Sequence, residues 1–240
     1  MKKKKIFVGM PSWSWFPYPE VMFQIFQQEM PEWYELVFNM ESIISWKVVH
    51  TARNDITRRF LLTDCDYLRW CDDDNPPSSD VLKYLIAANK NVCSALVPLR
   101  HWNYMLNLFK WRRNILSIAD EPNLFEVDNI WTGCVLLSRD IVKAVFEKTR
   151  WRPYQFLISE FVWNTKESIK EIYAWQDKIE WRENTYVAVD GKISTLPWET
   201  GEDLYFGMIA KELWYKFYAD KRARCTHFKW KPEVLTVRNT

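Results

Sequence analysis

Glycine is scarce in this sequence, with only 5 of 240 residues. The glycine-rich signatures of several enzyme classes are accordingly missing. No GxxxxGK[ST] loop is present, which argues against a P-loop NTPase, and no GxGxxG follows the first apolar run, which argues against a dinucleotide-binding fold. The GxSxG elbow, the HExxH motif and the protein-kinase signature set are absent as well. The chemistry must therefore be sought in other residue patterns.

Cysteine is also sparse and shows no metal-binding or disulfide pattern. The chain has 5 cysteines, an odd number, and none forms a CxxC pair. Several lie within apolar runs, where a free thiol behaves as a small hydrophobic group. This pattern predicts a reduced protein without a disulfide framework or a structural zinc site, as expected of a cytoplasmic protein.

Long hydrophobic runs and a strong charge bias are missing too. Pro11 interrupts the N-terminal apolar segment early, and no stretch approaches the roughly 20 apolar residues of a membrane span. The net charge of +2 gives no reason to expect nucleic-acid binding. Short basic runs such as Lys2–Lys5 and Lys110–Arg113 are typical of solvated faces, although one or two could contact diphosphate or a membrane surface. We expect a soluble cytoplasmic protein, with peripheral membrane contact left open.

Apolar residues, by contrast, are plentiful enough for a large core. They make up 48% of the chain, and 15 residues are tryptophan. Most of these aromatic residues should pack in the core, although some could form stacking surfaces for sugars and bases. No Gly/Ser/Pro-rich linker divides the chain, so we expect one domain over residues 1–240.

Strand and helix patterns alternate in the first half, which predicts βαβ units and a mainly parallel sheet. The expected strands are Lys5–Pro11, Tyr34–Met40, Tyr67–Cys71 and Asn91–Leu99, and the expected helices are Glu20–Met30, Ser42–Leu62 and Val81–Lys90. The second half predicts strands at Asn129–Leu137 and Arg224–Phe228, helices at Ile141–Lys148 and Leu204–Tyr218, and a hairpin within Tyr173–Ile193 that turns at Asp190-Gly191.

Three consecutive carboxylates, Asp72, Asp73 and Asp74, end the apolar run Tyr67–Cys71. Burial of any one of these charges without a partner would cost roughly several kcal/mol. The three aspartates should therefore lie at the carboxyl end of the strand, outside the core. In extended backbone Asp72 and Asp74 point to the same side. Two converging carboxylates suit a hard cation such as Mg²⁺ or Mn²⁺. An acidic turn with a capping role is the alternative.

Two later positions could complete such a site. Glu202 and Asp203 precede the expected helix Leu204–Tyr218. A carboxylate there can interact with the helix dipole, or it can act as a general base. His227 lies near the end of the last expected strand and could bind the metal through an imidazole nitrogen, although a lone histidine is more often structural.

The order of these motifs resembles that of GT-A fold glycosyltransferases, most closely the family 2-like group. The resemblance runs from Lys5 to about His227. Four segments carry it: Ala52–Asn54, Tyr67–Asp74, Trp131–Cys134 and Gly201–Phe206. It implies a mixed, mainly parallel sheet flanked by helices, with a Rossmann-like, nucleotide-binding half over residues 1–100 and an acceptor-binding half over residues 101–240.

The resemblance also implies roles for the acidic triplet and for the residues around the donor. Asp74 corresponds to a metal ligand, and Asp72 to a ligand of the metal or of the donor ribose. Asp73 is expected to point away from the metal or to contact the donor, rather than to bind the metal. Pro11 corresponds to the segment that holds the nucleotide base, and Arg53 to a residue near the donor nucleotide.

The remaining implied roles concern catalysis. Asp203 corresponds to the acidic base of inverting members, with Glu202 as its neighbour, and His227 to a late histidine on the metal or the diphosphate. The expected reaction is Mn²⁺- or Mg²⁺-dependent transfer of a sugar from a UDP- or GDP-sugar to a hydroxyl of a glycan, lipid or protein. Two alternatives stay open: a nucleotidyltransferase of similar fold, although Pro11–Trp15 is not the glycine-rich basic loop it would need, and a non-catalytic carbohydrate- or protein-binding module.

Overall fold

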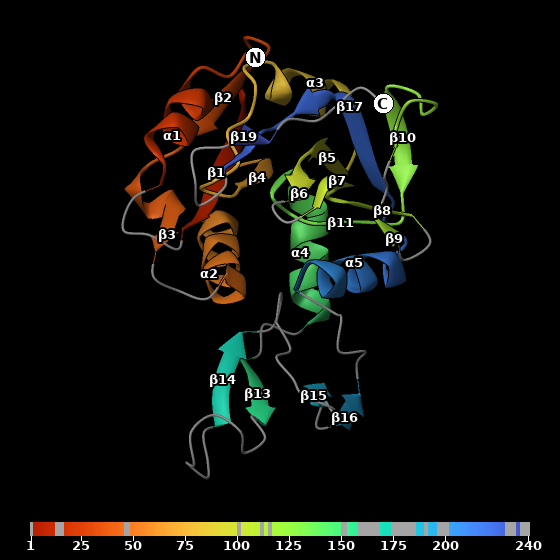
Figure 1. Cartoon of the computed structure of the whole chain (residues 1–240). Coiled ribbons are helices and arrows are strands. Elements are labelled where there is room, and N and C mark those ends of the chain that lie inside the picture. Colours follow the sequence, from red (N-terminus) through yellow and green to blue (C-terminus); the bar gives the residue numbers. More distant parts are fainter. Residues whose placement is uncertain are drawn as a thin grey trace.

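The computed structural model describes residues 2–12, 17–45, 49–99, 102–110, 113–114, 117–149, 153–157, 169–173, 186–189, 192–195, 202–228 and 234–235. An 8-stranded sheet organises the chain (Figure 1). Its strands lie in the order β10-β17-β5-β12-β4-β1-β2, and β3 pairs with the end of β1. The strands are β1 (Lys4–Ser12), β2 (Tyr34–Val37), β3 (Ile43–Ser45), β4 (Tyr67–Cys71), β5 (Val92–Leu96), β10 (Leu124–Val127), β12 (Cys134–Ser138) and β17 (Phe217–Arg224).

The sheet is mixed, with parallel pairs in the majority. β1 runs parallel to β2, β3 and β4, and β17 runs parallel to β5. β12 is antiparallel to both β4 and β5, between which it lies, and β10 is antiparallel to β17. Because β12 runs the other way, the start of β12 lies beside the end of β4.

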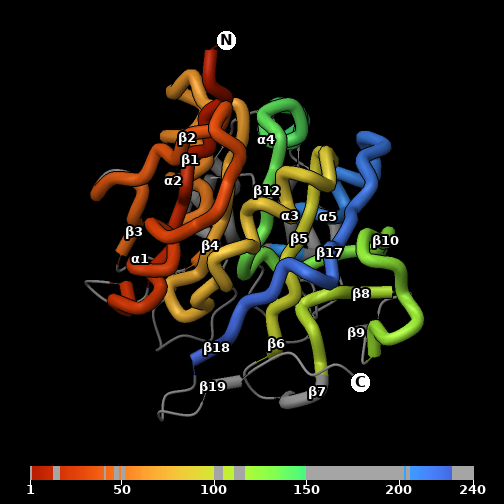
Figure 2. Tube along the Cα trace, turned by 90° about the horizontal axis from the view of Figure 1, so that it is seen from above, coloured from red at the N-terminus to blue at the C-terminus, as the bar shows by residue number. Residues whose placement is uncertain are grey.

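Helices cover both faces of this sheet. The helices are α1 (Pro19–Phe26), α2 (Val49–Leu62), α3 (Val81–Ala87), α4 (Arg139–Lys148) and α5 (Glu202–Glu212). Apolar residues of α2, α4 and α5 share one core cluster with Leu68 and Trp70 of β4. The opposite face packs against α1 and α3. Viewed from above, the N-terminal strands and helices lie beside the later green and blue elements (Figure 2).

Side chains point alternately to the two faces of the sheet along β4, and the strand is buried on both faces although it contains an arginine. Leu68 and Trp70 point into the cluster under α2, α4 and α5, whereas Arg69 and Cys71 point to the other face, and all four are buried. Complete burial of a side chain such as Leu68 contributes about 1.5–3 kcal/mol. The strand is therefore held firmly on both sides up to the residue before Asp72.

Smaller pairings complete the described structure. β6 (Pro98–Leu99) pairs with β7 (Trp102–Leu106), and β8 (Leu108–Lys110) pairs with both β9 (Arg113–Asn114) and β11 (Asn129–Ile130). Three two-stranded pairs come later in the chain: β13 (Pro153–Leu157) with β14 (Ile169–Tyr173), β15 (Tyr186–Val189) with β16 (Lys192–Thr195), and β18 (His227–Phe228) with β19 (Val234–Leu235). The β15–β16 pair confirms the expected hairpin, while its expected turn at residues 190–191 lies outside the described residues.

Several expectations about local structure are wrong. The expected helix Leu204–Tyr218 ends at Glu212, and Phe217 and Tyr218 already belong to β17. β1 continues through Pro11 to Ser12, because beyond Gly9 it pairs with β3 and no longer with β4, and an edge position tolerates the missing N–H. The expected helix Ser42–Leu62 begins only at Val49. Its first residues, Ile43–Ser45, form β3, since β-branched residues suit the extended pairing with β1. Among the residues that the structure describes, no helix is long and apolar enough to span a membrane.

Candidate functional site

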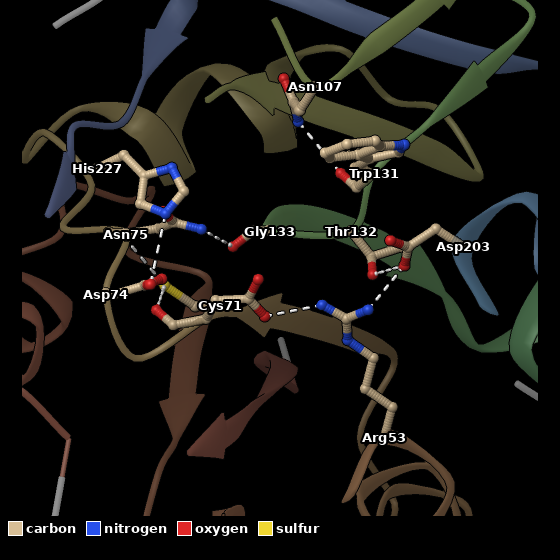
Figure 3. A network of polar contacts seen from close by, with 11 residues as sticks. Arg53, Cys71, Asp74, Asn75, Asn107, Trp131, Thr132, Gly133, Asp203 and His227 are labelled. Atoms are coloured by element: carbon tan, nitrogen blue, oxygen red, sulfur yellow. Dashed lines mark hydrogen bonds and ion pairs between the residues drawn. The ribbon is translucent and has the colours of Figure 1, made fainter. Parts of the chain in front are cut away.

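Polar side chains from five separate segments converge where β4 ends and β12 begins (Figure 3). Asp72 follows β4, Thr132 and Gly133 precede β12, and Arg53 comes from α2. Asp203 lies in the first turn of α5, and His227 begins β18. The topology thus brings together most of the residues that the sequence singled out.

Arg53 joins two of the predicted site residues directly. Its Nη2 donates to Asp72 Oδ1 at 2.8 Å, and its Nη1 donates to Asp203 Oδ1 at 2.7 Å. The Arg53 side chain is only 3% exposed, whereas those of Asp72 and Asp203 are 26% and 17% exposed. Its guanidinium also lies over the Trp70 ring, 5.8 Å from the centroid. One buried cation therefore holds the acidic triplet next to the predicted base.

Asp203 is oriented by a second contact. The hydroxyl of Thr132 donates to the same oxygen, Oδ1, that accepts from Arg53. Both of these bonds fall on one carboxylate oxygen, which leaves Oδ2 as the oxygen suited to take a proton. Glu202 is the first residue of α5, and its side chain lies outside the described part of the structure.

The backbone of Asp72 is fixed from the neighbouring strand. Its N–H donates to the carbonyl of Gly133 at 2.9 Å. A Cβ on Gly133 would lie 2.7 Å from Asn75 Nδ2 and 3.5 Å from Asp72 Oδ2. Gly133 thus permits a close approach, and the group that approaches is Asn75. Burial raises the pKa of the Asp72 carboxyl above its usual value, and the charge of Arg53 offsets this only in part.

The other two aspartates turn to different partners. Ser12, the last residue of β1, donates its hydroxyl to Asp73 Oδ2 at 2.5 Å. Asp74 Oδ2 lies 3.4 Å from His227 Nε2, and the Phe228 N–H donates to the Asp74 carbonyl at 2.9 Å. Each carboxylate of the triplet therefore contacts a different segment of the chain.

His227 is held in a defined orientation. Its Nδ1 lies 2.7 Å from the carbonyl oxygen of Pro98, so Nδ1 carries the proton and donates it. In the neutral ring Nε2 is then an acceptor that faces the Asp74 carboxylate. A backbone carbonyl on one ring nitrogen is the usual support of a histidine that binds a metal through the other.

The fit of a divalent cation can be tested on these groups. Within the described ranges, no cluster of three or more His, Cys, Asp or Glu side chains is arranged to hold a metal ion. Asp74 and His227 nevertheless present an oxygen and a nitrogen acceptor toward each other. Mg²⁺ and Mn²⁺ commonly take one or two protein ligands and fill the rest of their coordination with water and phosphate oxygens. The Asp74–His227 pair fits that type of site.

Several supporting residues were not predicted from the sequence. Asn107 accepts from the Val97 N–H at 2.9 Å and donates to the carbonyl of Trp131 at 3.1 Å, and so fixes the segment that carries Thr132. Thr132 lies in a motif that the sequence did single out, but no pattern marks Asn107 or Ser12. Pro11 is buried in β1; its assigned role, like those of the other site residues, stays a prediction.

No protein-family model and no curated protein matches the chain. Among solved structures, A197 from STIV is similar, with a TM-score of 0.57 and 14% identity over 99% of this chain and 95% of A197. S. aureus TarS gives a TM-score of 0.43 and 10% identity over 98% of this chain and 37% of TarS. Its residues 1–349 in complex with UDP give 0.36 and 13% over 58% and 48%. The similarity to A197, together with the sheet topology, confirms the fold class, a mixed, mainly parallel sheet flanked by helices.

Proposed function

We propose that this protein is a glycosyltransferase that moves a sugar from a nucleotide-diphosphate sugar to a hydroxyl acceptor. The observation that carries the proposal is the double ion pair of Arg53. It places Asp203, the candidate base, beside the acidic triplet, although the two are more than a hundred residues apart in the sequence. The mixed, mainly parallel sheet flanked by helices is compatible with the same reading.

Asp74 and His227 are the residues that would hold Mn²⁺ or Mg²⁺. When bound, such a cation would offset the negative charge that develops on the leaving diphosphate. Asp72 and Asp73 would contact the donor, as would Pro11 and Arg53. The UDP bound in the TarS complex is one nucleotide of the class that we propose here.

Asp203 would act as the general base. Arg53 and Thr132 hold its Oδ1, so that Oδ2 would accept the proton of the acceptor hydroxyl. Attack by the oxygen on the face opposite the leaving group would invert the anomeric carbon. Glu202, the residue before Asp203, would assist this base as a neighbouring carboxylate.

The decisive experiment is hydrolysis and transfer with a panel of UDP- and GDP-sugars, with and without Mn²⁺. We expect metal-dependent release of UDP or GDP from one donor. Asp74→Asn and Asp203→Asn should each reduce it by roughly two orders of magnitude or more. Asp120→Asn is a matched control, because Asp120 is an exposed aspartate outside the site.

Calorimetric titration with UDP and GDP distinguishes the alternatives. Metal-dependent nucleotide binding without any sugar release would contradict sugar transfer. Absence of nucleotide binding with and without Mn²⁺ would instead favour a non-catalytic binding module. A donor that is a nucleoside triphosphate, with release of pyrophosphate, would identify a nucleotidyltransferase.

A further inference from the structure

A groove lies at the end of the central sheet opposite the candidate functional site. It has a volume of about 320 Å³ and is lined by the start of β4, the turns that follow α3 and α5, and the end of β12. Tyr67, the first residue of β4, lines it, whereas Asp72 follows the last residue of the same strand. Five residues of strand span about 16 Å, so the groove is separate from the candidate active site.

Trp214 in the wall of this groove occupies an unusual position. Its N–H donates to the Lys211 carbonyl at 2.9 Å, and the Tyr215 N–H donates to the Ala210 carbonyl at 3.0 Å. This is the pattern that ends a helix with one left-handed residue, which is usually glycine. Here the residue is tryptophan, with φ 64. Its Cβ makes that conformation unfavourable.

Burial does not compensate for this conformation, because the Trp214 side chain is 93% exposed. A large aromatic side chain at this position therefore adds little to the stability of the fold, and its ring is exposed to solvent. Asn89 has φ 48 and ends α3 in a similar way, with its N–H donating to the Ile86 carbonyl at 3.0 Å. In the described part of the chain, these two are the non-glycine residues with positive φ, and both line the groove. Such conformations tend to gather at functional sites.

The polar groups of the groove are oriented by the protein itself. Ser138 Oγ donates to Asn91 Oδ1 at 2.8 Å, which sets the direction of that amide. Lys90 Nζ lies 4.5 Å from the centroid of the Tyr218 ring, and Lys216 pairs with Glu126 at 2.9 Å. Both lysines thus already have partners within the protein. The groove presents amide and hydroxyl groups and aromatic rings, rather than a strongly cationic surface.

We propose that this groove binds a carbohydrate chain, independently of the proposed transferase site. A sugar ring has one apolar C–H face, which can pack on the exposed ring of Trp214 or on Tyr215. Its hydroxyl groups can hydrogen-bond to Asn89, Asn91 and Ser138. A single-stranded nucleic acid would also stack on tryptophan, but it favours a basic track along its phosphates, and both lysines here are engaged.

Trp214→Gly tests the proposal, because binding and stability should change in opposite directions. Calorimetric titrations would use maltopentaose, chitopentaose and mannopentaose. We expect saturable binding of at least one by the wild-type protein and a loss of roughly tenfold or more in Trp214→Gly. The same variant should unfold at a higher temperature, since glycine relieves the left-handed conformation. Asn91→Ala should weaken binding without that gain in stability.

Trp33→Ala is the matched control, because Trp33 is also exposed, at 57%, and does not line the groove. It should leave sugar binding unchanged, and nucleotide-sugar hydrolysis should be unaffected in both tryptophan variants. Failure of all three oligosaccharides to bind the wild-type protein at millimolar concentration would overturn the proposal. So would equal binding by Trp214→Gly, an equal loss in Trp33→Ala, or binding of oligothymidylate in preference to every sugar.

Discussion

Replacement of Arg53 by methionine is the sharpest test of how the candidate site is held together. The guanidinium makes two charge-assisted contacts, at 2.8 Å to Asp72 and 2.7 Å to Asp203. Each contact of this kind contributes about 1.5–3 kcal/mol. Removal of one partner from a buried ion pair costs about 3–5 kcal/mol, because the other charge is left uncompensated. Since both aspartates keep some solvent exposure, we expect Arg53→Met to lose about 3 kcal/mol of unfolding free energy at pH 7.5.

The pH dependence of this loss has a definite sign. Burial raises the pKa of Asp72, and Arg53 lowers it. Without Arg53 the folded-state pKa of Asp72 rises further above its value in the unfolded chain. A carboxyl with a raised pKa destabilises the fold at neutral pH, and this destabilisation is relieved as the pH falls through that pKa. The difference in stability between wild type and Arg53→Met should therefore shrink by about 1 kcal/mol or more between pH 7.5 and pH 5.

Urea unfolding followed by circular dichroism at both pH values measures these quantities. Lys83→Met is the control, because it removes a cation from an exposed pair with Glu29 and should cost far less stability than Arg53→Met. Addition of Asp72→Asn to Arg53→Met should recover part of the loss, since it removes an uncompensated charge. A loss below about 1 kcal/mol for Arg53→Met, or a difference that widens at pH 5, would refute the argument.

Two further substitutions test the packing around the site. Gly133→Ala places a Cβ 2.7 Å from Asn75 Nδ2, so it should displace that buried amide and cost about 1–3 kcal/mol in urea unfolding; an unchanged midpoint would show that Asn75 moves freely. Arg69 is fully buried in β4, with Cys134 Sγ at 3.9 Å from Nη2, and its Nε and Nη1 make no hydrogen bond within the described structure. Arg69→Met should therefore leave stability unchanged or raise it by about 1–4 kcal/mol, and a loss above about 2 kcal/mol would contradict this expectation.

The central strands could be predicted from the sequence because each is a short segment with a clear apolar pattern. Tyr67–Cys71 is a short, mostly apolar segment that stops abruptly at three aspartates, and β4 has those bounds. The split of the expected helix Ser42–Leu62 was not predictable. Ile43–Ser45 becomes a strand only because the end of β1 offers it an edge, and that partner lies more than thirty residues away. Tertiary context decides such short apolar segments.

The charged residues of the candidate site could be predicted from the sequence, but the residues that hold them in place could not. Asp72, Asp74 and His227 stood out because charged or titratable residues at strand ends need partners. The contact of Arg53 with both Asp72 and Asp203 depends on how α2 and α5 pack on the same face of the sheet. The side chain of Asn107 makes four hydrogen bonds to backbone and side-chain groups, and no local sequence pattern predicts them. Single polar residues of this kind become visible only once the strands are in place.

The division of the acidic triplet among three partners explains how consecutive aspartates can coexist. Asp72 faces Arg53, Asp73 accepts from Ser12, and Asp74 faces His227. The guanidinium of Arg53, which is the positive charge near Asp72, already forms ion pairs with two carboxylates, those of Asp72 and Asp203. At Asp74 the nearby partner is a ring nitrogen that acts as an acceptor when the imidazole is neutral. A neutral imidazole brings no positive charge to Asp74, whereas the Arg53 guanidinium lies beside Asp72. The metal dependence of nucleotide binding should accordingly be lost in Asp74→Asn and only weakened in Asp72→Asn, and the reverse order would show that the cation binds on the Arg53 side.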